Sequence, residues 1–323
     1  MRVAIVGCGF IGRKRAASLQ GCTLAACADV DLPQAQTLAG TSALATDDWR
    51  RAVSLPEVDL VIVATTHDAL VPVTLAAIQA GKHVLVEKPA ARNCQELAPV
   101  MAAAAENGVL VRVGFNHRYH PALRKAQELF RAGALGEMMF VRGRYGHGGR
   151  LGYDREWRAD KVKAGGGELI DQGMHLIDLS RLFLGEFCQV KGLAHTYYWD
   201  MAVEDNGFML LTTEAKTTAF LHVSWTEWKN CFSLEIYGKA AKLEINGLGG
   251  SYGVERLAYY RMLPELGPPE TTIWEYPGPD KSWELEFAEF LEDIHLGRQP
   301  SAGLEDAFRA HQVIEAIYEE SGL

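Results

Sequence analysis

The sequence lacks the features that would indicate a membrane protein or a zinc protein. No apolar run approaches transmembrane length, and the apolar stretch at residues 3–6 is too short for the core of a signal peptide. None of the six cysteines belongs to a CxxC pair, so neither a zinc ribbon nor a redox dithiol is predicted. We expect a soluble cytoplasmic protein with no membrane partner and no structural disulfide.

The sequence also lacks an excess of basic residues. The 32 Lys and Arg residues face 41 Asp and Glu residues, and the formal net charge of -9 argues against a nucleic-acid partner. What is present is ordinary globular composition, with 48% hydrophobic and 23% charged residues. At 323 residues, two domains are expected. We place them at 1–118 and 119–323, with the C-terminal helices packing back on the first domain.

The first part of the chain alternates short β-branched runs with helical patterns. Strands are predicted at 3–6, 23–28, 60–64, 82–86 and 110–114, and helices at 10–19, 70–80 and 94–106. Near-continuous apolar strands separated by helices indicate a parallel sheet covered on both faces. The first domain is therefore predicted to be α/β.

Strand patterns dominate the second part. They occur at 139–145, 189–198, 208–213, 217–225, 232–237 and 242–245, with edge strands at 254–262 and 271–276. Helices are predicted at 121–132, 169–183, 283–296 and 304–320. Short connections favour antiparallel pairing, so we expect an α+β domain with a large, open, mostly antiparallel sheet.

Residues 7–12 read GCGFIG, a GxGxxG motif placed directly after a strand and at the start of a helix. That context predicts a dinucleotide site. Gly7 permits the tight turn, Gly9 admits a pyrophosphate, and Gly12 lets helix and strand pack closely. Phe10 and Ile11 open the helix whose N–H groups face the anion. The alternative is a strand-to-helix turn with no ligand.

Asp29 ends the second strand about 20 residues after the glycine loop, where a carboxylate hydrogen-bonds the adenosine ribose. A 2′-phosphate there would be repelled, and the next basic residue is Arg50. We therefore predict NAD, with NADP as the less favoured cofactor. The alternative role for Asp29 is a helix cap or turn residue.

Three polar residues, Thr65, Thr66 and His67, follow the third strand. The carboxyl edge of a parallel sheet faces the cofactor crevice, so these side chains are candidates for contact with ribose or pyrophosphate. For His67, a plain loop role is an equal alternative.

The next strand ends in Glu87-Lys88-Pro89. A charged side chain at the end of a buried strand costs free energy unless it is paired with an opposite charge or has a function. Glu87 and Lys88 are therefore predicted to reach the nicotinamide region, the alternative being an ordinary surface ion pair.

Asp171 and His175 are four residues apart and share one face of the predicted helix. Histidine titrates near pH ~6.5, so it can exchange an alcohol proton at cellular pH. Gly173, within the same helix, indicates close approach by the sheet or by a ligand. A structural Asp–His hydrogen bond is the alternative.

The order of GxGxxG, Glu-Lys-Pro and GGG followed by Asp-x-Gly-x-His resembles the glucose–fructose oxidoreductase, inositol dehydrogenase and rhizopine-catabolism (Gfo/Idh/MocA) family. The resemblance covers essentially the whole chain. It implies a Rossmann domain followed by an open-sheet α+β domain, and NAD(P)-dependent chemistry at a sugar or cyclitol carbinol. By position, Lys88, Asp171 and His175 match the family's catalytic residues.

The chemistry that we expect is hydride transfer between nicotinamide and a ring carbinol. His175 would act as general base or acid, oriented by Asp171, and Lys88 would stabilise charge on the reacting oxygen. Whether Lys88 or His175 carries the proton stays open, since free lysine has a pKa near ~10.4. A non-catalytic dinucleotide sensor and a reductase of a non-sugar substrate are the alternative functions.

Substrate contacts are predicted in two segments. Asn116 and Arg118 follow the last strand of the first domain, in a segment that resembles the one bordering the substrate pocket in this family. Tyr153, Trp157 and Arg158 lie in a loop rich in glycine, basic and aromatic residues. This loop suits a small polyhydroxylated substrate, including a phosphate- or nucleotide-linked sugar, and an ordinary solvated loop is an equal alternative. The spacing of His117 and His120 fits a metal pair, but no further ligand is evident and no metal is predicted.

The large sheet is predicted to have one face covered by helices. By alternation, we place Phe208, Leu210, Leu221 or Val223, and Trp225 on the other face. An apolar face of this size in water favours association. We therefore expect a homodimer or homotetramer formed through the C-terminal sheet.

Overall fold

A computed structural model describes all residues of the chain, 1–323. Its internal contacts divide the chain into two compact units. The first consists of Met1–Phe115, Val162–Gly165 and Trp283–Phe308. The second consists of Asn116–Lys161, Gly166–Ser282 and Arg309–Leu323. None of the helices combines the length and apolar character that crossing a bilayer requires.

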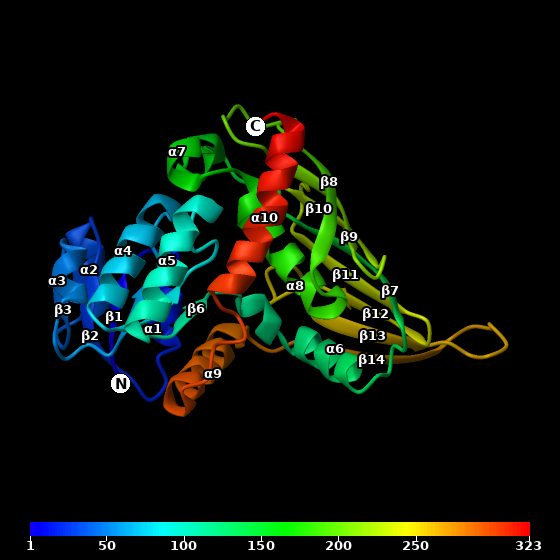
Figure 1. The fold of residues 1–323 in the computed structure, drawn as a ribbon, viewed down its shortest axis with the longest axis horizontal. Helices are drawn as coiled ribbons and strands as arrows, with labels where there is room; N and C mark the ends of the chain where they lie inside the picture. Colours follow the sequence, from blue (N-terminus) through cyan, green and yellow to red (C-terminus); the bar gives the residue numbers. More distant parts are fainter. The chain divides into compact units, whose positions relative to one another are not determined.

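The first unit is built on a parallel sheet of six strands (Figure 1). The strands are β1 (Arg2–Val6), β2 (Thr23–Ala28), β3 (Leu44–Thr46), β4 (Leu60–Val63), β5 (His83–Val86) and β6 (Val111–Val113). The connecting helices are α1 (Phe10–Ala17), α2 (Leu32–Ala39), α3 (Trp49–Val53), α4 (His67–Gln79) and α5 (Cys94–Asn107). The predicted parallel sheet is confirmed, and its apolar strands are buried because helices cover both faces.

The strand order is β3-β2-β1-β4-β5-β6, so the chain reverses direction across the sheet between β1 and β4. Such a reversal leaves a crevice at the carboxyl ends of the two strands, where open α/β sheets bind ligands. The three elements α2, β3 and α3 were not predicted from the sequence. With three residues, β3 is too short to show a periodic pattern.

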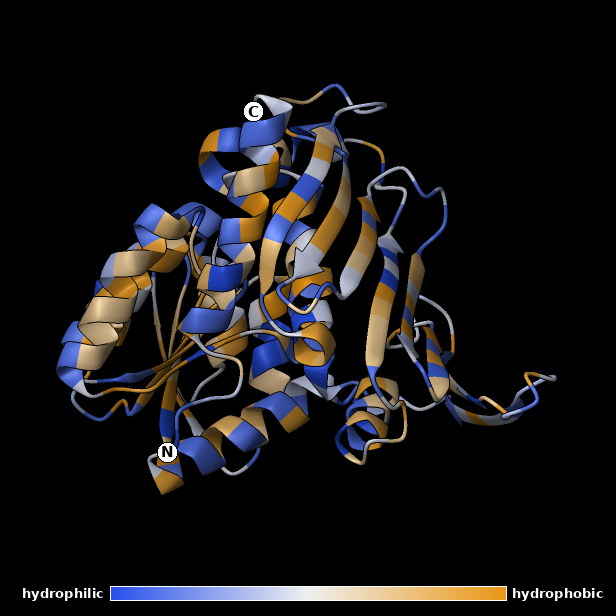
Figure 2. Cartoon of the chain, turned by 45° about the vertical axis from the view of Figure 1, so that its right-hand side comes forward, coloured by the Kyte–Doolittle hydropathy of each residue, from blue (hydrophilic) through white to orange (hydrophobic).

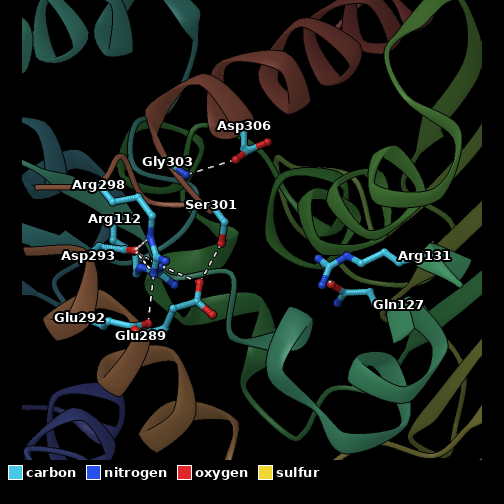
Figure 3. Close-up of polar contacts among 10 residues, drawn as sticks. All are labelled: Arg112, Gln127, Arg131, Glu289, Glu292, Asp293, Arg298, Ser301, Gly303 and Asp306. Atoms are coloured by element: carbon cyan, nitrogen blue, oxygen red, sulfur yellow. Dashed lines mark hydrogen bonds and ion pairs between the residues drawn. The ribbon is translucent and has the colours of Figure 1, made fainter. Parts of the chain in front are cut away.

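Helix α9 (Ser282–Leu296) lies far along the chain but packs in the core of the first unit. Phe287 and Phe290 are buried among β-strand side chains. Arg112, from β6, donates hydrogen bonds to Asp293 at 2.6 Å and to Glu289 at 3.0 Å, and Arg298 also binds Asp293 (Figure 3). Apolar packing and buried ion pairs therefore hold α9 in place.

The second unit contains a sheet of eight strands in the order β14-β13-β12-β11-β7-β10-β9-β8. The strands are β7 (Met138–Gly146), β8 (Phe187–His195), β9 (Asn206–Thr213), β10 (Thr218–Ser224), β11 (Cys231–Gly238), β12 (Ala241–Asn246), β13 (Glu255–Arg261) and β14 (Glu270–Tyr276). Only β7 and β10 pair in parallel. The prediction of a mostly antiparallel sheet is confirmed.

One face of this sheet is covered by helices α6 (Pro121–Arg131), α8 (Met174–Leu184) and the second half of α10 (Leu304–Ser321). Hydrophobic and hydrophilic residues alternate along the strands (Figure 2). The predicted composition of the open face is partly wrong. Leu221, Val223 and Trp225 are fully buried, whereas Leu210 and Phe220 are 47% and 52% exposed. The covering helices, which the strand pattern does not reveal, decide which alternate set is buried.

Candidate active site

The glycine loop lies at the crevice between β1 and β4. Gly7 has φ +92°, and a Cβ there would lie 2.3 Å from the carbonyl oxygen of Ala64. A Cβ at Gly12 would lie 1.9 Å from the carbonyl oxygen of Gly7. Around Gly9, in contrast, a Cβ would meet nothing within 4 Å. Two glycines thus permit close backbone packing, and the third leaves the open backbone surface that a pyrophosphate requires.

Asp29 projects from the end of β2 onto this loop. Its Oδ2 accepts a hydrogen bond from the Cys8 backbone N–H at 2.6 Å, and its Oδ1 accepts one from the Asp31 N–H at 2.9 Å. The neighbouring strand β3 pairs with β2 and is followed by Asp47 and Asp48. Acceptor capacity remains for ribose hydroxyls. A 2′-phosphate would meet an acidic edge here, so the residues present fit NAD better than NADP.

The residues after β4 are placed at the same crevice edge. The hydroxyl of Thr65 donates to the carbonyl oxygen of Thr66, and the hydroxyl of Thr66 donates to the carboxylate of Asp68. His67 is buried, and its Nδ1 donates to the carbonyl oxygen of Ala164 at 2.8 Å. The His67 ring therefore anchors the segment at 162–165 to the first unit.

Glu87 is part of a buried ion network. Arg15, from α1, donates to Glu87 at 2.6 Å and to Glu286 at 2.5 Å. Arg15 and Glu286 are fully buried. Burial raises the pKa of Glu286, although Arg15 acts in the opposite direction. Arg15 thus joins α1 both to Glu87, after β5, and to α9, an arrangement that the sequence did not reveal because the partners are remote along the chain.

Lys88 follows Glu87 at the carboxyl end of β5. Its side chain is half-buried, and the peptide bond between Lys88 and Pro89 is cis. The parallel register of β4 and β5 brings the segment after β5 to the same sheet edge as Thr65. This edge is where the chemistry of an open α/β sheet takes place.

A second group of polar residues, Asp171 and His175, lies on the helical segment of the second unit that the sequence predicted to carry the catalytic pair. A π-helical turn, η4 (Leu169–Gly173), carries Asp171 and leads directly into α8, which carries His175. Both side chains are buried, and Arg158 donates from Nε to Asp171 Oδ2 at 3.2 Å. A Cβ at Gly173 would lie 3.0 Å from the Leu169 side chain of the same helical segment and at an ordinary contact distance of 3.5 Å from Val223 of β10. The sheet therefore does not account for the close approach predicted there. Single π turns of this kind are frequent at functional sites.

His117 stacks on His175. It belongs to the short helix η1 (Asn116–Tyr119), and the two ring centroids are 3.7 Å apart with an interplanar angle of 16°. Its Nε2 is hydrogen-bonded to the hydroxyl of Tyr145 at 3.1 Å. Burial raises the pKa of Tyr145 well above its usual range and that of Tyr252 to about 12, so both hydroxyls keep their protons. The sequence pattern does not predict this stack, because the two rings come from segments that are remote along the chain.

The five predicted substrate residues lie in the second unit, and three of them are largely buried. Asn116 donates to the Ser282 hydroxyl at 2.9 Å, and Arg118 forms a bidentate pair with Asp178. Tyr153 is 3% exposed and packs against Trp225. Arg158 and Trp157 are half-buried and stack on each other, with 4.5 Å from guanidinium to ring centroid.

A buried carboxylate that the sequence did not indicate supports η4. Glu204 accepts hydrogen bonds from the backbone N–H groups of Gly167 and Leu169, each at 3.0 Å, and from the Tyr318 hydroxyl at 2.8 Å. Burial raises the pKa of Glu204. The carboxylate satisfies N–H groups at the start of the turn that carries Asp171.

Two family models match the chain. One, described as oxidoreductase family, NAD-binding Rossmann fold, matches residues 1–115. The other, described as GFO/IDH/MocA C-terminal domain, matches residues 123–244. Together they cover the parallel sheet and strands β7–β11 of the second sheet, together with most of β12.

Similar proteins carry related names. A levoglucosan dehydrogenase of Pseudarthrobacter phenanthrenivorans is 32% identical over 52% of this chain, an alignment that spans 44% of that protein. An inositol 2-dehydrogenase of Acidothermus cellulolyticus is 27% identical over 99% of this chain and 92% of its own length. The solved structure of GenD2 from gentamicin A biosynthesis in complex with NAD superposes with a TM-score of 0.85 at 26% identity, covering 100% of this chain and 94% of that one.

The motif order, the two sheets and both family models agree. The chain belongs to the Gfo/Idh/MocA family of NAD-binding oxidoreductases.

Proposed function

We propose that this protein is an NAD-dependent dehydrogenase or reductase that acts on a ring CH–OH group of a sugar, a phosphate- or nucleotide-linked sugar, or a cyclitol. Relatives named for levoglucosan and inositol support this substrate class. The observation that carries the proposal is the buried catalytic cluster of the second unit. There, Asp171 and His175 lie one turn apart and contact Arg158 and His117.

The cofactor is proposed to be NAD. Gly9 offers its open backbone to the pyrophosphate, and Asp29 accepts hydrogen bonds from the ribose hydroxyls. Phe10, Ile11, Thr65 and Thr66 are proposed to border the dinucleotide, whereas His67 and Glu87 act through the contacts that hold the crevice together. When bound, the nicotinamide ring accepts or returns a hydride.

The chain's own residues are proposed to handle the proton and the charge. His175 takes the alcohol proton during oxidation and returns it during reduction, and Asp171 orients the imidazole. Lys88 donates a hydrogen bond to the reacting oxygen and stabilises the negative charge that develops there. Trp157 and Arg158 are proposed to border the substrate. A contact of Asn116, Arg118 or Tyr153 with the substrate stays a prediction.

The experiment is a panel of sugars, sugar phosphates and inositols monitored at the NADH absorbance band, with Lys88→Ala as the companion variant. We expect at least one substrate of this class, and we expect Lys88→Ala to lower turnover by roughly 10²–10³-fold while NADH binding, followed by fluorescence, persists. A protein that binds NADH but reduces or oxidises no member of the panel would contradict the proposal.

The open face of the eight-stranded sheet supports a further proposal, that the protein is a homo-oligomer. Phe220, Leu210 and Leu193 are each about half exposed on this face. Contiguous apolar surface of this kind favours association through self-complementary contacts. Light scattering on the purified protein tests this, and a monomer at all concentrations would refute it. We also retain the proposal of a cytoplasmic location, which the six free thiols fit.

A further inference from the structure

Aromatic side chains gather at one end of the large sheet, in the loops that follow β7, β8 and β10. Tyr198 and Trp228 are 57% and 75% exposed, and their ring centroids are 5.1 Å apart. Tyr198 also contacts Trp199 at 5.3 Å, and Trp199 contacts Tyr153 at 5.8 Å. These four rings form a continuous aromatic ladder from the solvent inward.

The inner end of the ladder lies in the loop that serves the candidate catalytic cluster. Tyr153 and Arg158 belong to two consecutive short helices, η2 (Tyr153–Arg155) and η3 (Trp157–Ala159), which contact each other. Arg158 donates to Asp171. The charge of Asp171 also contributes to the raised pKa of Tyr153, after burial as the main cause. The ladder is thus continuous with the residues proposed to hold the substrate.

Hydrogen bonds hold the loop after β8, which presents Tyr198 and Trp199. The fully buried carboxylate of Asp205 accepts hydrogen bonds from three consecutive backbone N–H groups, those of Tyr197, Tyr198 and Trp199, at 2.8–3.0 Å. The indole N–H of Trp199 donates to the carbonyl oxygen of Trp225 at 3.0 Å. A ring held in this way can bind a ligand with little loss of conformational entropy.

Trp228 adopts a backbone conformation that folding alone does not favour. Its φ is +56°, in the left-handed region that glycine prefers. The same residue exposes most of a large apolar ring to water. A strained, exposed tryptophan gains little for the folded state, and strain of this type gathers at functional sites.

We propose that Trp228 and Tyr198, whose rings meet at 78°, form a corner-shaped subsite in which one ring stacks on a sugar ring of the substrate, other than the ring that is oxidised, and the second ring borders it. This inference rests on the proposed function. The apolar C–H face of a pyranose fits a flat aromatic ring, and the phenol and indole groups offer polar edges to its hydroxyls. The preferred substrates are accordingly glycosides or oligosaccharides.

The test compares a one-ring substrate with its two-ring and three-ring counterparts in three variants. Trp228→Gly removes the ring and relieves the backbone, Trp228→Phe keeps a stacking ring, and Leu266→Gly is the matched control. Leu266 is 84% exposed with φ +55° in the β13–β14 hairpin, so it shares exposure and backbone conformation with Trp228 but lies in a different loop.

We expect Trp228→Gly to raise KM for the longer substrates about tenfold and to leave KM for the one-ring substrate unchanged. Trp228→Phe should recover most of the loss, Leu266→Gly should change neither KM, and thermal stability should rise in Trp228→Gly. The decisive quantity is the KM for the longer substrates divided by the KM for the one-ring substrate. If this ratio is the same in Trp228→Gly and in the parent protein, the inference is overturned. A change of oligomeric mass in Trp228→Gly also overturns it, because the patch would then be an interface between copies.

A binding readout separates this inference from the proposed function. Saturation-transfer NMR detects a trisaccharide on the parent protein without cofactor, and we expect the signal of the non-oxidised rings to disappear in Trp228→Gly. Absence of any transfer to those rings in the parent protein refutes the subsite even if a one-ring sugar is turned over. Turnover of no sugar at all refutes the proposed function, and the NMR result then decides whether the aromatic patch binds carbohydrate.

Discussion

The imidazole rings of His117 and His175 lie parallel, with their centroids 3.7 Å apart. They come from η1 and α8, which are remote along the chain. His117 is in turn held by Tyr145 and Asn116. The pair therefore fixes the orientation of the proposed proton acceptor.

Removing the stacked ring is expected to slow the reaction. His117→Ala should lower kcat/KM about tenfold or more, because misplacement of His175 by even a fraction of an ångström weakens proton transfer. His117→Phe preserves a flat ring and should lose less. The measurement is steady-state kinetics on the substrate found in the panel, with circular dichroism to verify folding. Equal losses in both variants would show that the stack itself does not position His175.

Two glycines of the same loop should respond differently to alanine. Gly9→Ala meets open space and should fold normally, yet it should weaken NADH binding by about 1.5–3 kcal/mol, since a methyl group obstructs hydrogen bonds to the pyrophosphate. Gly12→Ala places its Cβ 1.9 Å from a backbone oxygen and should destabilise the fold by about 3 kcal/mol. Thermal melts and NADH titration check both results. Normal NADH affinity in Gly9→Ala would refute the proposed cofactor position.

The charge of Asp29 is expected to select NAD. Asp29→Asn keeps an acceptor oxygen for the Cys8 N–H and removes the repulsion of a 2′-phosphate. The preference for NAD over NADP, measured as a ratio of kcat/KM values, should fall about tenfold, equivalent to about 1.4 kcal/mol. Glu214→Gln, in the turn between β9 and β10 of the second unit, is the control for loss of one exposed charge. If the ratio changes equally in both variants, Asp29 has no specific role.

Acid is expected to destabilise the fold through two half-buried histidines, His147 and His222. Burial lowers the pKa of His147 and of His222, so the folded state favours their neutral forms. Below the unfolded value of ~6.5, the unfolded chain binds more protons, and the free energy of unfolding must fall as the pH falls. His147→Asn should flatten this dependence between about pH 6.5 and 5. Urea unfolding at several pH values measures it, with His195→Asn as the exposed control. An unchanged slope in His147→Asn would contradict the assignment.

The Arg15 network should be costly to break on one side. Arg15→Met leaves Glu87 and Glu286 buried without their shared cation and should lower stability by about 3–5 kcal/mol. Adding Glu87→Gln and Glu286→Gln to this variant should restore much of the loss, because no buried charge remains. Thermal unfolding of the single and triple variants measures whether the lost stability is restored. A triple variant as unstable as the single one would show that packing, and not charge, sets the cost.

Local features of the sequence predicted five of the six strands of the first sheet and the outline of the cofactor site. A strand followed by GxGxxG and then by Asp29 one βα unit later predicts the dinucleotide loop, because these parts follow one another at a fixed spacing within a single βαβ unit. The strands of the second unit were recognised for the same reason, since alternation has a period of two residues.

Tertiary structure alone decided which groups meet. Residues separated by 271 positions, Arg15 and Glu286, form one buried pair, and His117 joins His175 from another helix. The open face was partly mispredicted because alternation defines two faces without saying which one a helix covers. Partner choice among buried charges and rings depends on packing between distant segments, and no pattern within a single segment encodes it.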